Sequence, residues 1–172
     1  MPNHRPRGFT LVELLTTLLL LSILAHLAVP ALARMQQQNR NQAALEAANN
    51  LLQYARSQAV LRRQTLNLCP SHDGVQCTTD WNAPWLLSDI RSGERLSYSA
   101  LHSASGLLRW SGFSNSIRFH RNGTSSLSNG RFFTCLENTI DQQLVINRQG
   151  RIRRASALEN SQHSARCLGQ QM

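Results

Sequence analysis

The sequence contains no lysine. All 18 basic residues are arginines, and with nine acidic residues they give a formal net charge of +9. The absence excludes enzymes that need a Schiff-base lysine, a phosphate loop ending in Gly-Lys, or a Ser-x-x-Lys pair. A guanidinium group matches phosphate with a planar fork of donors and stays charged at any relevant pH. An arginine-rich composition by itself is explained as well by general solubility or a GC-rich genome as by phosphate binding. The positions of the arginines must decide between these explanations.

Aromatic residues are also scarce, at 6% of the 172 residues, so the core must rest on Leu, Ile, Val and Ala. This length allows one domain and an N-terminal helix, but not two independent cores of ordinary size. Ser, His and Asp occur in no recognisable catalytic motif, and no pair of acids suggests a metal site or a glycosidase. We therefore expect a protein that is not an enzyme and holds no metal or cofactor.

Four cysteines follow the apolar N-terminal segment, namely Cys69, Cys77, Cys135 and Cys167. An even number in a translocated domain predicts two disulfides, and three pairings are possible. We favour Cys69–Cys77, which closes a short loop, and Cys135–Cys167, which ties down the C-terminal tail. Zinc binding with His72 is the weaker alternative, because no Cys-x-x-Cys spacing occurs.

The N-terminus combines a short basic segment with a long apolar one. Residues 1–8 carry His4, Arg5 and Arg7 and no acid, and residues 9–33 are almost wholly apolar. Twenty-five helical residues at about 1.5 Å each can span the hydrocarbon core of a bilayer. Since the basic flank comes first, it should stay cytoplasmic while the remainder crosses.

Glu13 is the exception within this apolar segment. A carboxylate in hydrocarbon is costly and predicts a functional role. Cleavage between Gly8 and Phe9 would create a cation four residues away, the new α-amino group. Glu13 could neutralise this group within its own helix, or on a staggered neighbouring subunit.

Residues Gly8-Phe9-Thr10-Leu11-Val12-Glu13, followed by an apolar run and Pro30, resemble the leader of type IV pilins and type II secretion pseudopilins. The resemblance implies that a prepilin peptidase cuts after Gly8 and methylates Phe9, that Glu13 is the assembly glutamate, and that Pro30 kinks the helix. An ordinary membrane anchor would explain the hydrophobicity but not this motif. Retention of residues 1–8 in the mature protein would contradict the resemblance.

The pattern predicts an α+β fold, with a long N-terminal helix whose first half is transmembrane, packed on an antiparallel β-sheet domain, and the resemblance implies that this fold is of the pilin type. We expect a leader (1–8), a transmembrane or filament-core helix (9–35) and a globular domain (36–172) that includes the second half of the helix. Ala44, Ala48, Leu51, Leu52, Ala55 and Ala59 form the apolar face of a helix that continues to about Arg63. Strands are expected at 65–68, 84–87, 107–110, 116–120, 131–135, 143–147 and from 151. The turns Asn122-Gly123 and Asn129-Gly130 favour an antiparallel meander.

Arginines gather towards the C-terminus. From Arg109 onward there are nine arginines and three acids, and four of the arginines fall in residues 148–154. On a strand, Arg151 and Arg153 would point to one face about 6.6 Å apart, while Ile152 points into the core. With Arg148 at the adjoining turn and Gly150 permitting close approach, they form a candidate clamp for backbone phosphate. A simple solvated, positively charged hairpin is an equally good explanation from these residues alone.

A narrower resemblance favours the clamp. The leader, the Cys69–Cys77 loop before a Trp-rich stretch, and Gly150-Arg151-Ile152-Arg153 are similar to the FimT branch of the FimT/GspH-like minor pilins. This resemblance implies that Arg151 and Arg153 contact double-stranded DNA, supported by Arg148 and Arg154, during natural transformation. The alternative is a structural minor pilin, or a GspH-like pseudopilin that primes assembly without binding DNA.

The expected partners are other pilins, the prepilin peptidase, double-stranded DNA and, before assembly, the inner membrane. In this scheme the chain is first a single-pass inner-membrane protein with a periplasmic domain. It then becomes part of an extracellular pilus.

Overall fold

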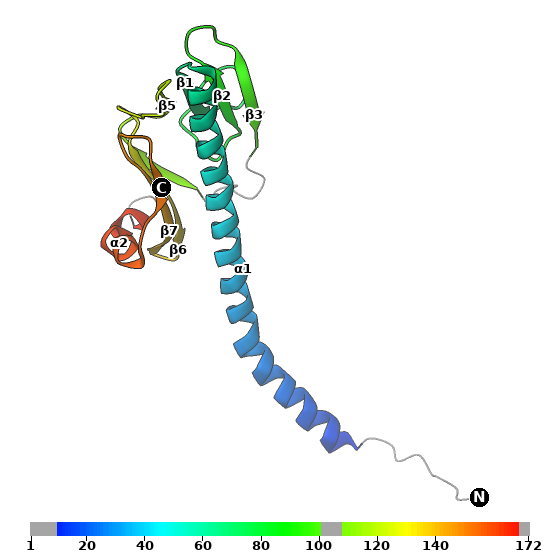
Figure 1. Ribbon diagram of the computed structural model, residues 1–172. Helices are drawn as coiled ribbons and strands as arrows, with labels where there is room; N and C mark the ends of the chain where they lie inside the picture. Colours follow the sequence, from blue (N-terminus) through cyan, green and yellow to red (C-terminus); the bar gives the residue numbers. More distant parts are fainter. Residues whose placement is uncertain (1–9, 101–107, 169–172) are drawn as a thin grey trace, which may run out of the picture. The chain divides into compact units, whose positions relative to one another are not determined.

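The computed structural model describes residues 10–100 and 108–168, and its chain divides into two units, Met1–Gln37 and Gln38–Met172 (Figure 1). Gly8 and Phe9, the leader, and Leu107 of the third expected strand lie outside the described residues. The elements are α1 (Leu11–Arg62), β1 (Leu66–Pro70), β2 (Trp85–Asp89), β3 (Arg95–Ser99), β4 (Arg109–Gly112), β5 (Ile117–Phe119), β6 (Gly130–Leu136), β7 (Thr139–Ile146), β8 (Ile152–Arg154), α2 (Ala157–Gln162) and a 3-10 turn, η1 (Ser164–Cys167).

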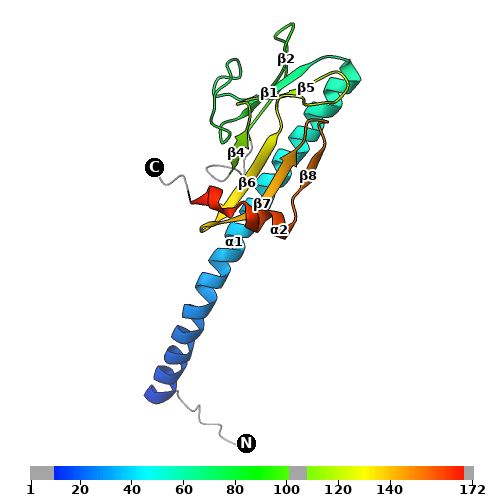
Figure 2. The same ribbon diagram turned by 90° about the vertical axis from the view of Figure 1, so that its left-hand side faces the viewer.

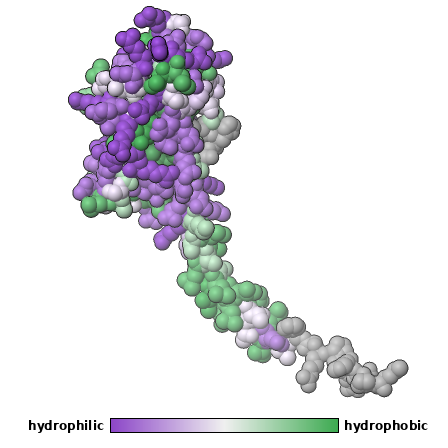
Figure 3. Space-filling view, in the orientation of Figure 1, coloured by the Kyte–Doolittle hydropathy of each residue, from purple (hydrophilic) through white to green (hydrophobic). Residues whose placement is uncertain are grey.

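The described part of the first unit consists of the beginning of α1. Every residue from 10 to 36 is exposed, and most are apolar, as the green surface of this segment shows (Figure 3). Among the described residues, α1 is the one helix long and apolar enough to cross a membrane. Pro30 lies inside the helix, where it lacks the N–H that would complete one backbone hydrogen bond.

The described residues of the second unit form two four-stranded antiparallel sheets, with strand orders β3-β2-β1-β5 and β4-β6-β7-β8. The α+β class, a long helix with antiparallel sheet, is therefore confirmed, but the single meander is wrong. The Asn122-Gly123 turn is formed, with the Gly123 N–H donating to the His120 carbonyl at 2.7 Å. The chain then leaves β5, which pairs with β1, and Asn129-Gly130 leads into β6, in the other sheet. The turn predicted at Asn129-Gly130 is therefore wrong, because Gly130 is already the first residue of β6.

The second half of α1 lies along β6, β7 and β8 (Figure 2). Its Ala44, Ala48, Leu52, Ala55 and Ala59 are fully buried, as the spacing predicted, and Leu51 is half-buried. Small alanines let the helix approach the sheets closely. The helix ends at Arg62, one residue before the predicted end.

An aromatic cluster joins the two sheets. Trp85 of β2 and Phe132 of β6 are fully buried, with ring centroids 5.1 Å apart, and Trp81 and Trp110 pack around them. Each such aromatic pair stabilises the fold by about 0.5–1.5 kcal/mol beyond the contribution of the apolar area that it buries. Every buried residue among those described lies between Asn41 and Cys167, so residues 36–172 contain the whole described core. A core of its own is what a segment needs in order to fold alone.

Two disulfides, Cys69–Cys77 and Cys135–Cys167, join the cysteines in the pairing that the spacing favoured. They leave no free thiol in the described chain, so zinc binding by the first pair with His72 is excluded while the bond is intact. The second bond fixes η1 against β6, and through it holds the C-terminal segment that follows β8.

Candidate nucleic-acid interface

The turn between β7 and β8 is built by Asn147 and Gly150. The Gly150 N–H donates to the Asn147 carbonyl at 2.9 Å, and the Arg151 N–H donates to Asn147 Oδ1 at 2.9 Å. Gly150 has φ +74°, a left-handed conformation that glycine adopts without penalty. A side chain here would also collide with the Gly123 carbonyl oxygen, so glycine is required both by its φ and by the neighbouring turn.

Arg148 and Arg151 project from this turn, and both are exposed. Within the described chain neither guanidinium has an acidic partner. Ile152, between Arg151 and Arg153, is 9% exposed and belongs to the core, as the alternation predicted. The buried Ile152 thus anchors a turn whose two arginines are free to meet an anion.

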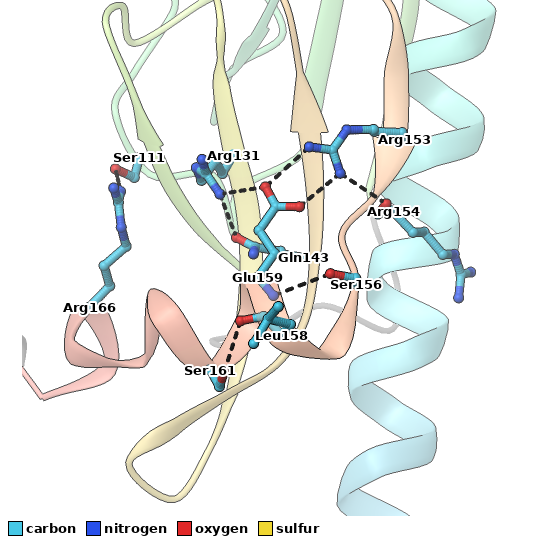
Figure 4. Close-up of polar contacts among 10 residues, drawn as sticks. All are labelled: Ser111, Arg131, Gln143, Arg153, Arg154, Ser156, Leu158, Glu159, Ser161 and Arg166. Carbon is cyan, nitrogen blue, oxygen red and sulfur yellow. Dashed lines mark hydrogen bonds and ion pairs between the residues drawn. The ribbon is translucent and has the colours of Figure 1, made fainter.

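Arg153 is engaged with an acid that the sequence analysis did not assign to the site. Its Nη1 lies 2.8 Å from Glu159 Oε2 and its Nη2 lies 3.1 Å from Glu159 Oε1, a bidentate pair (Figure 4). Arg131 of β6 reaches the same carboxylate, with Nη1 3.2 Å from Oε1. One carboxylate therefore partly neutralises two arginines.

The surroundings of Glu159 stabilise its ionised form. The hydrogen bond from Arg153 lowers the pKa of this carboxyl, burial partly opposes the shift, and the positive charges of Arg153 and Arg131 lower the pKa further. The same contact raises the pKa of Arg153. Glu159 stands in the first turn of α2, where its N–H donates to Ser156 Oγ at 3.2 Å. A carboxylate is favoured at the N-terminal end of a helix. The helix cap and the ion pairs therefore both fix the position of Glu159.

Arg154 points the other way. It is opposite the buried Leu144 in the β7–β8 register, and its Nη2 lies 3.1 Å from Glu46 Oε1 on α1. Both side chains are about half exposed, and such surface pairs contribute only about 0–1 kcal/mol. We call residues 148–154 the arginine hairpin. It brings the five predicted positions together, but leaves only Arg148 and Arg151 without an acid.

The sequence did carry one signal for the missed acid. Ser156-x-x-Glu159 is a capping-box spacing, which predicts a helix start directly after β8. It does not predict that the helix returns across β6 and β7, which is what places Glu159 against Arg131 and Arg153.

Glu13, the predicted assembly residue, is exposed in the first turn of α1. Its N–H donates to Thr10 Oγ1 at 3.3 Å, so Thr10 caps the described start of the helix. The cleavage and methylation positions, Gly8 and Phe9, lie outside the described residues. The pairing of Glu13 with the Phe9 amine remains a prediction.

Within the described residues, no group of three or more His, Cys, Asp or Glu side chains gathers as a metal site would require. The chemistry that the hairpin offers is instead electrostatic, a set of guanidinium groups on an exposed turn.

An exposed apolar N-terminal helix that continues into a globular unit of antiparallel sheets defines the pilin-like class of filament subunits. The sequence matches the prokaryotic N-terminal methylation motif over residues 3–29 and the family described as type II transport protein GspH over residues 44–150, more than half of the chain. The chain belongs to this GspH family.

Solved structures agree with this assignment. The chain is similar to the type IV minor pilin FimU of Pseudomonas aeruginosa strain PAO1 in two crystal forms. In the first the identity is 25% and the TM-score 0.54, over 71% of this chain and 92% of that chain. In the second these values are 27% and 0.53, over 67% and 92%. A comparison with curated proteins finds no match. The protein is thus a membrane-anchored, minor pilin-like or pseudopilin-like component, of a family that associates with other pilins.

Proposed function

We propose that this chain is a minor type IV pilin that binds extracellular double-stranded DNA through the arginine hairpin and supports DNA uptake in natural transformation. The observation that carries the proposal is the exposure of Arg148 and Arg151 on one turn without an acid beside them. Gly150 keeps that turn tight and free of a side chain. Arg153, and Arg154 from the opposite face of β8, add their charge once a phosphate competes with their acids.

Such a site binds the backbone and not the bases, so its affinity should be independent of sequence and steeply dependent on salt. Each neutralised phosphate contributes about −0.9 to the slope of log K against log salt, so four arginines predict a slope of about −3.6. DNA held in this way would travel with the pilus as it retracts.

The test is duplex binding by residues 36–172, because this part contains the whole described core. We expect Arg148→Gln with Arg151→Gln to lower affinity for a 30-base-pair duplex by about tenfold, since two unpaired cations are lost. Arg153→Gln with Arg154→Gln should cost less, because each of those arginines is already paired with an acid. The control is Arg40→Gln with Arg95→Gln, which removes the same charge from exposed arginines elsewhere. Equal affinity in the first variant and the control would overturn the hairpin site.

We further propose the maturation and location that the leader implies. Prepilin peptidase removes residues 1–8 and methylates Phe9, and residues 9–35 anchor the chain in the inner membrane. The same helix then enters the filament core, with Glu13 pairing with a Phe9 amine, while residues 36–172 move from the periplasm to the extracellular pilus. The exposed apolar surface of α1 supports this order, because it needs either lipid or other pilin helices around it.

A second function is favoured by the internal pairing of Arg153 and Arg154 and by the match to the type II transport protein family. In this alternative the chain is a structural minor pilin or a secretion pseudopilin that primes assembly. Absence of duplex binding by residues 36–172 at moderate salt would favour it over the DNA-uptake function.

A further inference from the structure

A second concentration of arginines lies in a hollow of about 660 Å³ on the globular unit. The hollow is formed where α1 ends, β1 begins, the chain turns between β2 and β3, and β5 ends. Arg63, Arg91, Arg118 and Arg121 line it, together with His120. We call this feature the basic hollow.

Its charge is largely uncompensated. All four arginines are exposed, and Arg63, Arg118 and Arg121 have no acidic partner within the described chain. Asp89 also lines the hollow, but it is buried and its Oδ1 accepts the N–H groups of Arg91 at 2.5 Å and Ser92 at 2.9 Å. This carboxylate serves the β2–β3 turn, and a surplus of three positive charges remains.

Arg63 adopts a conformation that favours glycine. Its φ is +54°, and its N–H donates to Val60 O while the Gln64 N–H donates to Ala59 O. This pattern is a Schellman cap, in which glycine normally occupies the position of Arg63. A non-glycine residue there costs about 1 kcal/mol or more. The chain therefore keeps an arginine at the rim of the hollow against a conformational cost, which indicates a use for its side chain.

The basic hollow is continuous with the arginine hairpin. Arg121 belongs to the turn at Gly123, and the Gly150 turn packs directly on the Gly123 carbonyl. The Ser125 N–H donates to the Arg148 carbonyl at 3.0 Å, and Arg56 Nε donates to the Gly123 carbonyl at 3.0 Å. These contacts fix the two turns side by side, so Arg121 connects the arginines of the hairpin with those of the hollow.

We infer that the basic hollow is a second phosphate-binding site for the duplex, so that one DNA backbone runs from the arginine hairpin over the Arg121 turn into the hollow. This inference rests on the proposed DNA-binding function, and it names a second set of contact residues for the same partner. One strand of duplex DNA carries one charge per about 3.4 Å of helix axis, so a continuous arginine track meets several phosphates at once.

The experiment measures binding of a 30-base-pair duplex to residues 36–172 over a range of salt. Arg118→Gln with Arg121→Gln should lower affinity by about tenfold and make the salt slope less negative by about 1.8, two contacts at 0.9 each. Arg40→Gln with Arg95→Gln is the control of equal charge. Arg63→Gly is the most informative variant, because it should weaken binding while raising the stability of the protein, which separates the lost contact from misfolding.

The outcomes distinguish the two proposals. Weak binding by both the hairpin and the hollow variants supports a continuous site. If only the hairpin variant binds weakly, the hollow has no role in DNA binding, although the proposed function stands. If the wild-type domain binds no duplex, both the proposed function and the inference are overturned. Inorganic phosphate is tested in parallel by its effect on thermal stability. In another outcome, the hollow variant binds duplex DNA as the wild type does and yet is no longer stabilised by phosphate. That result would make the hollow a small-anion site and overturn the inference.

Discussion

Glu159 is the residue that most directly limits the charge of the arginine hairpin. It accepts from both ends of the Arg153 guanidinium and from Arg131, and these contacts lower the pKa of its carboxyl. A phosphate that binds Arg153 must displace this carboxylate or share the guanidinium with it. Under the proposed function, Glu159 therefore competes with DNA for Arg153.

The variant Glu159→Gln should bind duplex DNA more tightly, by about fivefold, since it releases Arg153 and removes a charge that repels phosphate. It should also lower stability, because Arg131 and Glu159 are only 23% and 20% exposed and lose their charge-assisted contact. Binding is measured by titration of residues 36–172. Glu137→Gln is the matched control: it removes the same charge from the turn between β6 and β7, the end of β7 opposite Gly150. Equal affinity of the two variants would show that Glu159 does not compete with the duplex.

Two glycines with nearly the same φ allow a clean comparison at the hairpin. Gly93 has φ +72° and open space where a Cβ would lie, whereas Gly150 has φ +74° and a Cβ there would meet the Gly123 carbonyl. Gly93→Ala should cost about 1–2 kcal/mol, the penalty of the left-handed conformation. Gly150→Ala should cost about 1–3 kcal/mol more, since the two turns must move apart. Urea denaturation measures both, and equal losses would contradict the close packing of the turns.

At the scale of elements, the sequence predicted the helices and strands whose apolar residues recur at a regular spacing along one buried face. The face of α1 and the buried Ile152 followed from spacing alone. β3 was missed, because it has exposed ends and no buried residue, so its alternation is weak. α2 was missed for the same reason: it is six residues long and buries none of them. Elements without a buried face leave no hydrophobic pattern, and the acid on α2 was missed with its helix.

The pairing of strands was predictable only in part. Asn122-Gly123 marked a true turn, whereas Gly130 is the first residue of β6 and Asn129-Gly130 forms no turn. A tight turn in any case specifies a reversal and not the sheet that the chain joins next. The partition into two sheets depends on Trp85 and Phe132, which come from different sheets and pack together in the core. That long-range packing is not encoded in any short segment.

The Cys135–Cys167 disulfide should hold the C-terminal element in place. It closes a loop of 32 residues, for which the chain-entropy estimate of stabilisation is about 4 kcal/mol. Cys135→Ala with Cys167→Ala should lower stability by up to that amount and raise amide exchange in α2 and η1 before the rest of the domain. Because Glu159 would leave Arg153 more often, the variant should also bind DNA more tightly. Unchanged protection of α2 would show that its contacts with β7 suffice without the disulfide.

At the scale of the whole molecule, the two proposed tasks, filament packing and DNA binding, fall on separate units. The described part of the first unit buries no side chain, whereas the second holds the described core and both arginine-lined surfaces. Filament packing and DNA binding should therefore be separable by mutation. The leader motif predicted the first task from a few consecutive residues, since processing and insertion depend on local sequence. The second task depends on turns that only folding brings together, such as Gly123 and Gly150.

Glu13→Gln tests this separation, because it removes the one acid in the apolar segment while keeping the size of the side chain. A neutral residue at this depth should insert in a membrane at least as well, so membrane residence and cleavage after Gly8 should persist. Recovery of the protein in sheared filaments should fall by about tenfold or more, since the Phe9 amine of a neighbour loses its counter-charge. Mass spectrometry of the mature N-terminus, which should begin at methylated Phe9, serves as the control for processing. Duplex binding by the purified full-length variant in detergent should equal that of the wild type, because Glu13 lies outside the globular core. A variant that enters filaments normally would show that Glu13 only completes the N-terminal turn capped by Thr10.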